Sequence, residues 1–205
     1  MSKERKASAA RARRRTDGRF RIIGGEWRSR RLPVPDAAEV RPTPDRVRET
    51  VFNWLAPVVQ GARCLDLYAG SGALGLEALS RGAAGVVFVD RAPRVCAQLR
   101  SNLELLGCAR AEVLCMDAMS CLEGRASPYD LVFLDPPYGK SLLEPLLSRL
   151  AAQPWLAAGG RVYLEQEAGA PLPPLPAGWT LARSARAGQV SYHLATRGAA
   201  EKGDD

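Results

Sequence analysis

Short apolar segments alternate with segments of helical periodicity from residue 62 onward. The apolar segments are short enough for strands, and several lack polar alternation, as expected of parallel strands covered on both faces. The predicted strands are residues 63–68, 85–90, 111–117, 129–135 and 161–166. The predicted helices are residues 71–82, 92–106 and 140–152. This alternation predicts an α/β fold with a mostly parallel sheet and helices on both faces.

Both ends of this pattern carry predicted hairpins. Residues 179–183 and 189–196 flank Gly188 and predict a C-terminal antiparallel hairpin. Residues 19–32 interleave basic, apolar and aromatic side chains around a Gly-Gly turn, which predicts a small basic hairpin before the sheet.

A helix is predicted between the basic hairpin and the first strand, over residues 45–55. Asp45 is a candidate N-cap, and apolar side chains recur on one helical face. Arg46 and Arg48 belong to the same helix, and a solvated face accounts for both.

Charge is concentrated at the start of the chain. The 205 residues carry a net charge of +7, but residues 1–31 hold twelve Lys and Arg against three Asp and Glu, a charge of +9. The rest of the chain therefore carries −2. This asymmetry predicts a polyanionic partner such as nucleic acid. A solvated tail without a specific partner is the alternative.

Several classes of protein are disfavoured by composition. No apolar run reaches the roughly 18 residues that a spanning helix needs, so no membrane segment is expected. Five cysteines without a C-x-x-C pair, and one histidine, argue against a zinc site. Scattered thiols and the lack of an apolar leader predict a cytoplasmic protein.

The first predicted strand runs into a glycine-rich loop. Gly70, Gly72 and Gly75 form G-x-G-x-x-G between a strand and a helix, a setting typical of cofactor binding. Glycine also lets the backbone approach a ligand closely. A dinucleotide site would place its pyrophosphate at this helix N-terminus. Asp66 would repel that pyrophosphate, and it favours the ammonium or sulfonium of S-adenosylmethionine instead.

Two further strands also end in aspartate. Asp90 can accept hydrogen bonds from two ribose hydroxyls, and Asp117 can accept one from an adenine amino group. Helix capping is the alternative for each, and for Asp117 the two interpretations carry equal weight.

The fourth strand ends in Asp135-Pro136-Pro137-Tyr138. The prolines fix an extended backbone. The Asp135 carboxylate and the Pro136 carbonyl are two acceptors for an exocyclic amino group, and Tyr138 offers a ring on which a base can stack. Such acceptors stabilise the positive charge that develops as an amine is methylated. A proline-rich turn with a packing tyrosine is the alternative.

These motifs resemble those of class I, Rossmann-like S-adenosylmethionine-dependent methyltransferases. D-L-Y-A-G-S-G is similar to the first motif of that class and D-P-P-Y to its fourth. The stretches RIIGGEWRSRRL, RPTPDRVRETVFNWL and DLYAGSGALGLEALSRGA resemble the bacterial 16S ribosomal RNA guanine-N2 methyltransferases. The resemblance covers roughly residues 20–196, and Pro44 replaces a threonine that is common in that family.

The resemblance implies a seven-stranded, mostly parallel sheet with a C-terminal antiparallel hairpin, S-adenosylmethionine as cofactor, and 16S RNA or the small ribosomal subunit as partner. A monomer is expected. Asp66, Gly70 and Gly72 should line the methionine end of the donor, Asp90 the ribose and Asp117 the adenine. The expected cofactor contacts are Thr43, Asp66, Tyr68, Ala69, Gly70, Ser71, Gly72, Asp90, Arg91, Asp117 and Ala118. The expected catalytic residues that hold the guanine are Asp135, Pro136, Pro137 and Tyr138.

The basic cluster is expected to bind RNA. Its arginines would contact phosphates, while Trp27 either stacks on a base or anchors the hairpin. The predicted RNA-binding residues are Arg13, Arg14, Arg15, Arg19, Arg21, Trp27, Arg28, Arg30 and Arg31. The chain is expected to divide into four segments: a disordered basic tail (1–18), an RNA-binding hairpin and helix (19–60), a catalytic domain (61–197) and a disordered tail (198–205).

Three other functions are considered. A DNA adenine-N6 methyltransferase would use the same D-P-P-Y sequence. A non-catalytic ribosome-assembly or RNA-binding protein predicts a broken first or fourth motif, and neither is broken. An NAD-dependent oxidoreductase is disfavoured by Asp66 and by D-P-P-Y.

Overall fold

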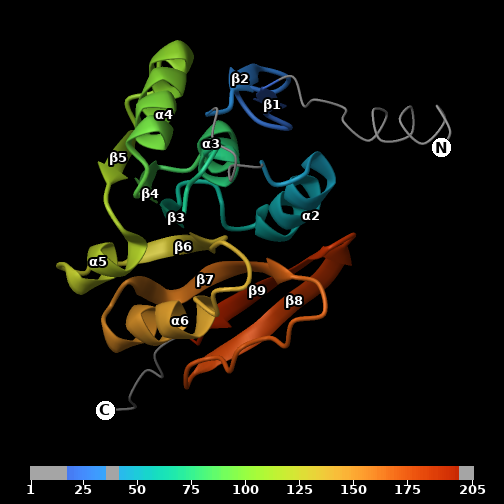
Figure 1. Ribbon diagram of the computed structural model, residues 1–205, viewed down its shortest axis with the longest axis vertical. Helices are drawn as coiled ribbons and strands as arrows, with labels where there is room; N and C mark the ends of the chain where they lie inside the picture. The colour runs from blue at the N-terminus through green and yellow to red at the C-terminus, as the bar shows by residue number, and fades with distance from the viewer. Residues whose placement is uncertain (1–17, 36–41, 199–205) are drawn as a thin grey trace, which may run out of the picture.

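A seven-stranded sheet organises the computed structural model, which describes residues 18–35 and 42–198 (Figure 1). Its strand order is β5-β4-β3-β6-β7-β9-β8. The bounds are β3 Arg63–Leu67, β4 Gly85–Asp90, β5 Ala111–Cys115, β6 Tyr129–Leu134, β7 Leu156–Glu167, β8 Trp179–Ala187 and β9 Val190–Arg197. Strands β3 to β7 pair in parallel, and β9 pairs antiparallel with both β7 and β8. The mostly parallel fold and its C-terminal hairpin are confirmed.

Two hydrophobic layers enclose this sheet. On one face, α5 (Ala118–Glu123) and α6 (Leu143–Ala152) pack over alternate strand residues such as Leu65 and Val132. On the other face lie α2 (Asp45–Leu55), α3 (Ala73–Ser80) and α4 (Pro93–Leu106). Strand residues alternate between the two layers because successive side chains point to opposite faces. Both faces are therefore covered, as the apolar strands predict.

The basic hairpin is a separate two-stranded sheet, β1 (Arg19–Arg21) and β2 (Arg31–Pro33). It joins the α3 layer through the Glu26 N–H, which donates to the Ser80 carbonyl at 2.7 Å. The approach is so close that a Cβ on Gly25, whose φ is +78°, would lie 1.8 Å from that oxygen. The hairpin therefore packs directly on the end of α3.

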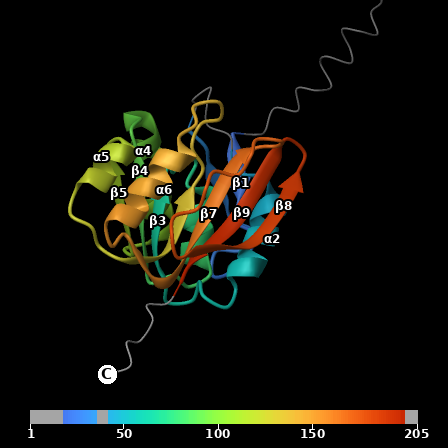
Figure 2. The ribbon, with the colours of Figure 1, turned by 90° about the horizontal axis from the view of Figure 1, so that it is seen from below.

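Helix α2 packs against the C-terminal hairpin of β8 and β9. Figure 2 shows β7, β9 and β8 side by side with α2 next to them. Trp54 of α2 stacks on Tyr192 of β9, with 5.4 Å between ring centroids. In the described residues, no helix is both long and apolar enough to cross a membrane.

Several element boundaries differ from the prediction. Helix α3 begins at Ala73 because Gly72 has a left-handed backbone with φ +75°. Helix α5 was not predicted, and β7 begins at Leu156, five residues early. Pro44 is the N-cap of α2, so the capping prediction for Asp45 is wrong. The Asp45 carboxylate instead binds Arg21 and Arg48.

Candidate active site at the carboxyl edge of the sheet

A tight loop joins β3 to α3. Tyr68, Gly70 and Gly72 all have positive φ, at +64°, +52° and +75°. The Gly72 N–H donates to the Ala69 carbonyl at 2.7 Å, and the Ala69 N–H donates to the Val89 carbonyl at 3.0 Å. Left-handed backbone is costly for a tyrosine, so the surrounding structure enforces the shape of this loop.

The glycines of this loop permit close packing inside the protein. A Cβ on Gly72 would lie 2.4 Å from Leu99 Cδ2, and one on Gly75 would lie 2.3 Å from Phe88 Cε1. The space beside these glycines is thus filled by protein side chains. At Gly72 and Gly75 the absent side chains make room for α4 and β4, and a close approach of the loop backbone to a ligand stays a prediction.

Asp66 lies under the loop on β3. Its side chain is buried, and Oδ2 accepts the Gly75 N–H at 3.0 Å. Burial raises the pKa of this carboxyl to about 8, partly offset by the Gly75 hydrogen bond. Asp66 therefore supports the start of α3, and a direct contact with the methionine end of the donor stays a prediction.

Asp90 ends β4 beside the loop and is half-buried. Its Oδ2 accepts the Gly70 N–H at 3.0 Å, and its Oδ1 accepts the Ala92 N–H at 2.9 Å. A carboxylate oxygen has a second lone pair, so both oxygens can still accept from hydroxyl groups. The carboxylate is thereby fixed against the glycine loop, where a ribose is expected.

Asp117 caps α5. Its Oδ1 accepts the N–H groups of Met119 and Ser120 at 2.8 and 3.4 Å. The capping interpretation is therefore confirmed, and an adenine contact stays a prediction. Burial and the negative charge of Asp117 raise the pKa of the half-buried Tyr68 hydroxyl.

Small residues complete the predicted cofactor edge. Ala69, Ser71 and Ala118 are buried, whereas Arg91 is exposed. Thr43 precedes α2, is 6% exposed, and its carbonyl accepts Arg48 Nε at 3.1 Å. The four buried side chains therefore pack within the loop and its surroundings, and Arg91 presents its charged group to solvent.

The D-P-P-Y sequence follows β6 at the same edge. Asp135 is the first residue after the strand, Pro136 is buried, and Pro137 and Tyr138 are exposed. In the described part of the chain the Asp135 carboxylate accepts no hydrogen bond from protein, unlike those of Asp66, Asp90 and Asp117. Burial raises its pKa well above the usual range, and the negative charges of Glu165 and Asp66 raise it further. Asp135 is thus an acceptor left available for a ligand.

Glu165 is the functional candidate that sequence reasoning missed. It lies on β7 and is 4% exposed. Its Oε1 accepts Tyr138 Oη at 2.8 Å, and its Oε2 accepts Tyr163 Oη at 2.6 Å. Glu165 therefore connects the D-P-P-Y loop to the buried sheet.

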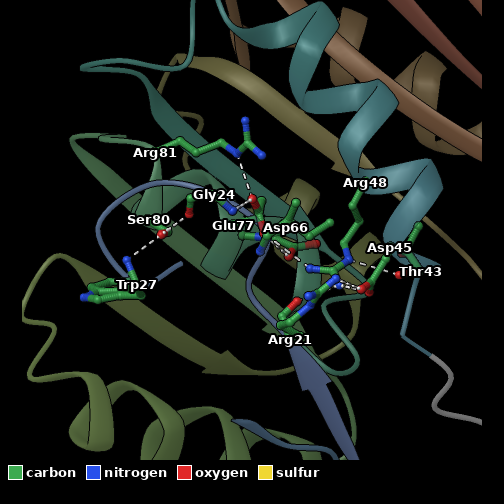
Figure 3. A network of polar contacts seen from close by, with 12 residues as sticks. Arg21, Gly24, Trp27, Thr43, Asp45, Arg48, Asp66, Glu77, Ser80 and Arg81 are labelled. Atoms are coloured by element: carbon green, nitrogen blue, oxygen red, sulfur yellow. Dashed lines mark hydrogen bonds and ion pairs between the residues drawn. The ribbon is translucent and has the colours of Figure 1, made fainter. Parts of the chain in front are cut away.

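A buried ion-pair network joins the N-terminal segment to α3 (Figure 3). Glu77 of α3 is fully buried and accepts the Ile23 and Gly24 N–H groups at 2.8 and 2.9 Å. It also binds Arg48 Nη1 at 3.3 Å and Arg81 Nε at 2.7 Å. The interpretation of Arg48 as a solvated side chain is wrong, because it has no exposed surface and connects α2 with the hairpin.

The predicted RNA-binding residues divide into three groups. Arg13, Arg14 and Arg15 lie outside the described residues, as do most of the two predicted tails. The hairpin arginines are exposed, namely Arg19, Arg21, Arg28, Arg30 and Arg31. Trp27 is 6% exposed, and its backbone N–H donates to Ser80 Oγ at 2.9 Å. This burial corrects the stacking prediction and favours the alternative, in which Trp27 anchors the hairpin.

The chemistry of this edge fits S-adenosylmethionine. Four aspartates lie at or near the carboxyl ends of the adjacent strands β3 to β6, namely Asp66, Asp90, Asp117 and Asp135. Carboxylates suit ribose hydroxyls and a positively charged donor, and they repel a pyrophosphate. In the parts that the structure describes, no group of His, Cys, Asp and Glu could hold a metal ion.

Comparison with known proteins gives the family. The family described as "Conserved hypothetical protein 95" matches residues 20–196. Ribosomal RNA small subunit methyltransferase D of Escherichia coli strain K12 is 50% identical over 187 residues, covering 91% of this chain and 94% of that protein. This chain belongs to the family of ribosomal RNA small subunit methyltransferase D.

A second relative and a solved structure support the same family assignment. Methyltransferase D of Haemophilus influenzae is 44% identical over 181 residues, covering 86% of this chain and 93% of that protein. The solved structure of the putative methyltransferase yhhF from Escherichia coli has a TM-score of 0.82 and 50% identity, covering 89% of this chain and 99% of that one. The family resemblance read from stretches within residues 20–196 is therefore confirmed, together with the class I methyltransferase fold read from the first and fourth motifs.

Proposed function

We propose that this chain transfers a methyl group from S-adenosylmethionine to the exocyclic N2 amino group of one guanine in 16S ribosomal RNA, on the small subunit or an assembly intermediate. The observation that carries the proposal is the available Asp135 carboxylate beside the exposed ring of Tyr138. Both lie at the sheet edge that holds the glycine loop. The names of the family relatives support ribosomal RNA of the small subunit as the substrate class.

Bound S-adenosylmethionine supplies an activated methyl group on a positively charged sulfur. Asp90 and the loop backbone at Gly70 would hold its ribose, since that carboxylate is already fixed by two N–H groups. The Asp66 carboxyl, buried under the loop, accepts the Gly75 N–H and supports the start of α3. These groups bind and orient the donor.

Asp135 and the Pro136 carbonyl act on the acceptor. Each accepts one N–H of the amino group, so the nitrogen lone pair turns toward the methyl donor and the developing positive charge is stabilised. Asp135 can also take the proton that the nitrogen releases, because its pKa is raised by burial. Tyr138 would stack on the guanine.

The RNA must present its base to this edge. A guanine within a helix cannot reach a pocket at the end of a strand, so the target is unstacked or lies in a loop. The exposed hairpin arginines would bind the flanking phosphates. If about five such contacts form on single-stranded RNA, log affinity falls against log salt with a slope of roughly −3.5.

Labelled S-adenosylmethionine tests this function with three acceptors: small subunits that lack the modification, naked 16S RNA and duplex DNA. Transfer to either RNA acceptor, and not to DNA, is expected. Asp135→Asn should lower kcat by roughly a hundredfold or more while the Kd for S-adenosylmethionine stays within about twofold. Unchanged turnover in Asp135→Asn contradicts the role of this carboxylate, and transfer to DNA alone contradicts the substrate class.

A further inference from the structure

Glu165 adjoins the D-P-P-Y loop although it belongs to neither motif. Leu134 of β6 pairs with Leu164 of β7, and Asp135 and Glu165 each follow those partners by one residue. Asp135 and Glu165 therefore stand side by side at the sheet edge, on the face that also carries Phe133 and Tyr163.

The Glu165 carboxylate joins two tyrosines that differ in exposure. Tyr163 is 1% exposed and donates to Oε2, which anchors the carboxylate in the core. Tyr138 donates to Oε1, while 43% of its surface remains exposed. The hydroxyl of Tyr138 is thus fixed and its ring remains accessible to a base.

The D-P-P-Y loop has few other attachments. Among the described residues, no other hydrogen bond joins residues 136–141 to the rest of the chain. Gly139 and Ser141 both have positive φ, at +76° and +47°, and the next helix, α6, begins only at Leu143. Neither a helix nor a strand therefore follows Tyr138 directly. Its ring position therefore depends on Glu165.

We propose that Glu165 is a positioning residue for methyl transfer, which holds the Tyr138 ring beside Asp135 in the orientation that the target base needs for stacking. This role rests on the function proposed above and concerns how the same site receives its base. A carboxylate suits it because each oxygen accepts from one tyrosine, and hydrogen bonds to a charged acceptor are the stronger kind.

The charge of Glu165 has a cost that an anchor of the core alone would not require. Its own pKa is raised by burial and lowered by the two tyrosine hydroxyls, and its charge raises the pKa of Asp135. Two adjacent carboxylates, one of them buried, are unfavourable. Their juxtaposition is understandable if one accepts the amino group while the other fixes the ring that stacks on the base.

Steady-state kinetics on unmodified small subunits separates positioning from stability. Glu165→Ala and Tyr138→Phe should each lower kcat/KM for RNA by about tenfold or more, the effect of losing one hydrogen bond to a charged group. The double variant should be no worse than about the Glu165→Ala variant, because both changes remove the same bond. Glu165→Gln keeps one acceptor oxygen for Tyr138 and should recover kcat/KM to within about threefold of wild type. The Kd for S-adenosylmethionine should stay within about twofold throughout.

Tyr129→Phe is the matched control, since Tyr129 is the first residue of β6, at the far end of the strand from the D-P-P-Y loop, and stacks on Trp155. It should leave kcat/KM unchanged. Full multiplication of the Glu165→Ala and Tyr138→Phe effects contradicts positioning through Tyr138. A Glu165→Gln variant as impaired as Glu165→Ala also contradicts it, because the acceptor oxygen that glutamine retains would then not restore the position of the ring.

An NMR measurement tests the position of the ring without activity. The chain has five tyrosines, and ring-labelled protein yields the Tyr138 signal as the one lost in Tyr138→Phe. Glu165→Ala should shift this signal toward that of a freely rotating tyrosine, and Glu165→Gln should restore it. An unchanged signal in Glu165→Ala refutes the positioning role, whereas wild-type protein that methylates no RNA refutes only the proposed function.

Discussion

Replacing Arg48 with methionine should remove a large part of the protein's stability. The guanidinium has no exposed surface and makes four hydrogen bonds. It donates to the Thr43 carbonyl at 3.1 Å, the Arg21 carbonyl at 2.8 Å, Asp45 Oδ1 at 2.7 Å and Glu77 Oε2 at 3.3 Å. Arg48→Met keeps much of the side-chain volume but leaves these acceptors without their donor.

The magnitude follows from the burial of Glu77. Breaking a buried ion pair by removing one partner costs about 3–5 kcal/mol. Glu77 keeps Arg81 and two N–H donors, so a loss near 3 kcal/mol in the free energy of unfolding is expected. With an m-value of about 2 kcal/mol per molar, the urea midpoint should fall by about 1.5 M.

Urea unfolding at neutral pH, followed by tryptophan fluorescence, measures this change. Arg46→Met is the matched control, because Arg46 lies on the same helix and is exposed. It should change the free energy of unfolding by no more than about 0.5 kcal/mol. If Arg48→Met loses less than about 1 kcal/mol, the buried network does not hold the N-terminal segment on α3.

Four further changes test other parts of the site. Asp90→Ala should weaken S-adenosylmethionine binding by about tenfold or more, measured by calorimetry, because ribose acceptors are lost; an unaltered Kd refutes the ribose assignment. Gly75→Ala should destabilise the protein by about 1–3 kcal/mol in urea, because its Cβ would lie 2.3 Å from Phe88; wild-type stability would show that α3 can shift freely. Burial raises the pKa of Asp66 to about 8, so the folded state binds this proton more tightly than the unfolded state, and stability falls as pH rises from about 4 to 8. Asp66→Asn should therefore be more stable than wild type without S-adenosylmethionine, by a margin that grows as the pH rises across that range. A margin that does not change with pH contradicts the raised pKa of Asp66. Deleting residues 1–18 should lower RNA affinity and flatten its salt dependence, and an unchanged slope would mark this tail as solvated charge.

The sheet and its carboxyl edge follow from sequence patterns because they depend on local signals. Apolar runs predict buried strands, and parallel strands bring their C-terminal residues to one edge. Asp90 and Asp135 are therefore placed correctly by their positions alone. Helix α4 ends at Leu106 as predicted, and Gly107 follows it in the left-handed conformation.

Contacts between distant segments could not be predicted in this way. Arg48 lies on an amphipathic helix and looks like a solvated residue, because its partner Glu77 is 29 residues away and belongs to another helix. Glu165 lies within an apolar strand, and its function depends on a loop 27 residues earlier. One feature of the sequence could have indicated Glu165. It lies two residues after Tyr163 in a predicted buried strand, and a buried charged residue requires a partner.

Identification of the modified nucleoside tests the central claim most directly. Unmodified small subunits and naked 16S RNA are incubated with the protein and labelled S-adenosylmethionine, digested to nucleosides and separated by chromatography with mass spectrometry. The site built from Asp135, Pro136 and Tyr138 predicts a single labelled product, N2-methylguanosine. Labelled N6-methyladenosine, or a methyl group on a ring carbon or ribose oxygen, would contradict it.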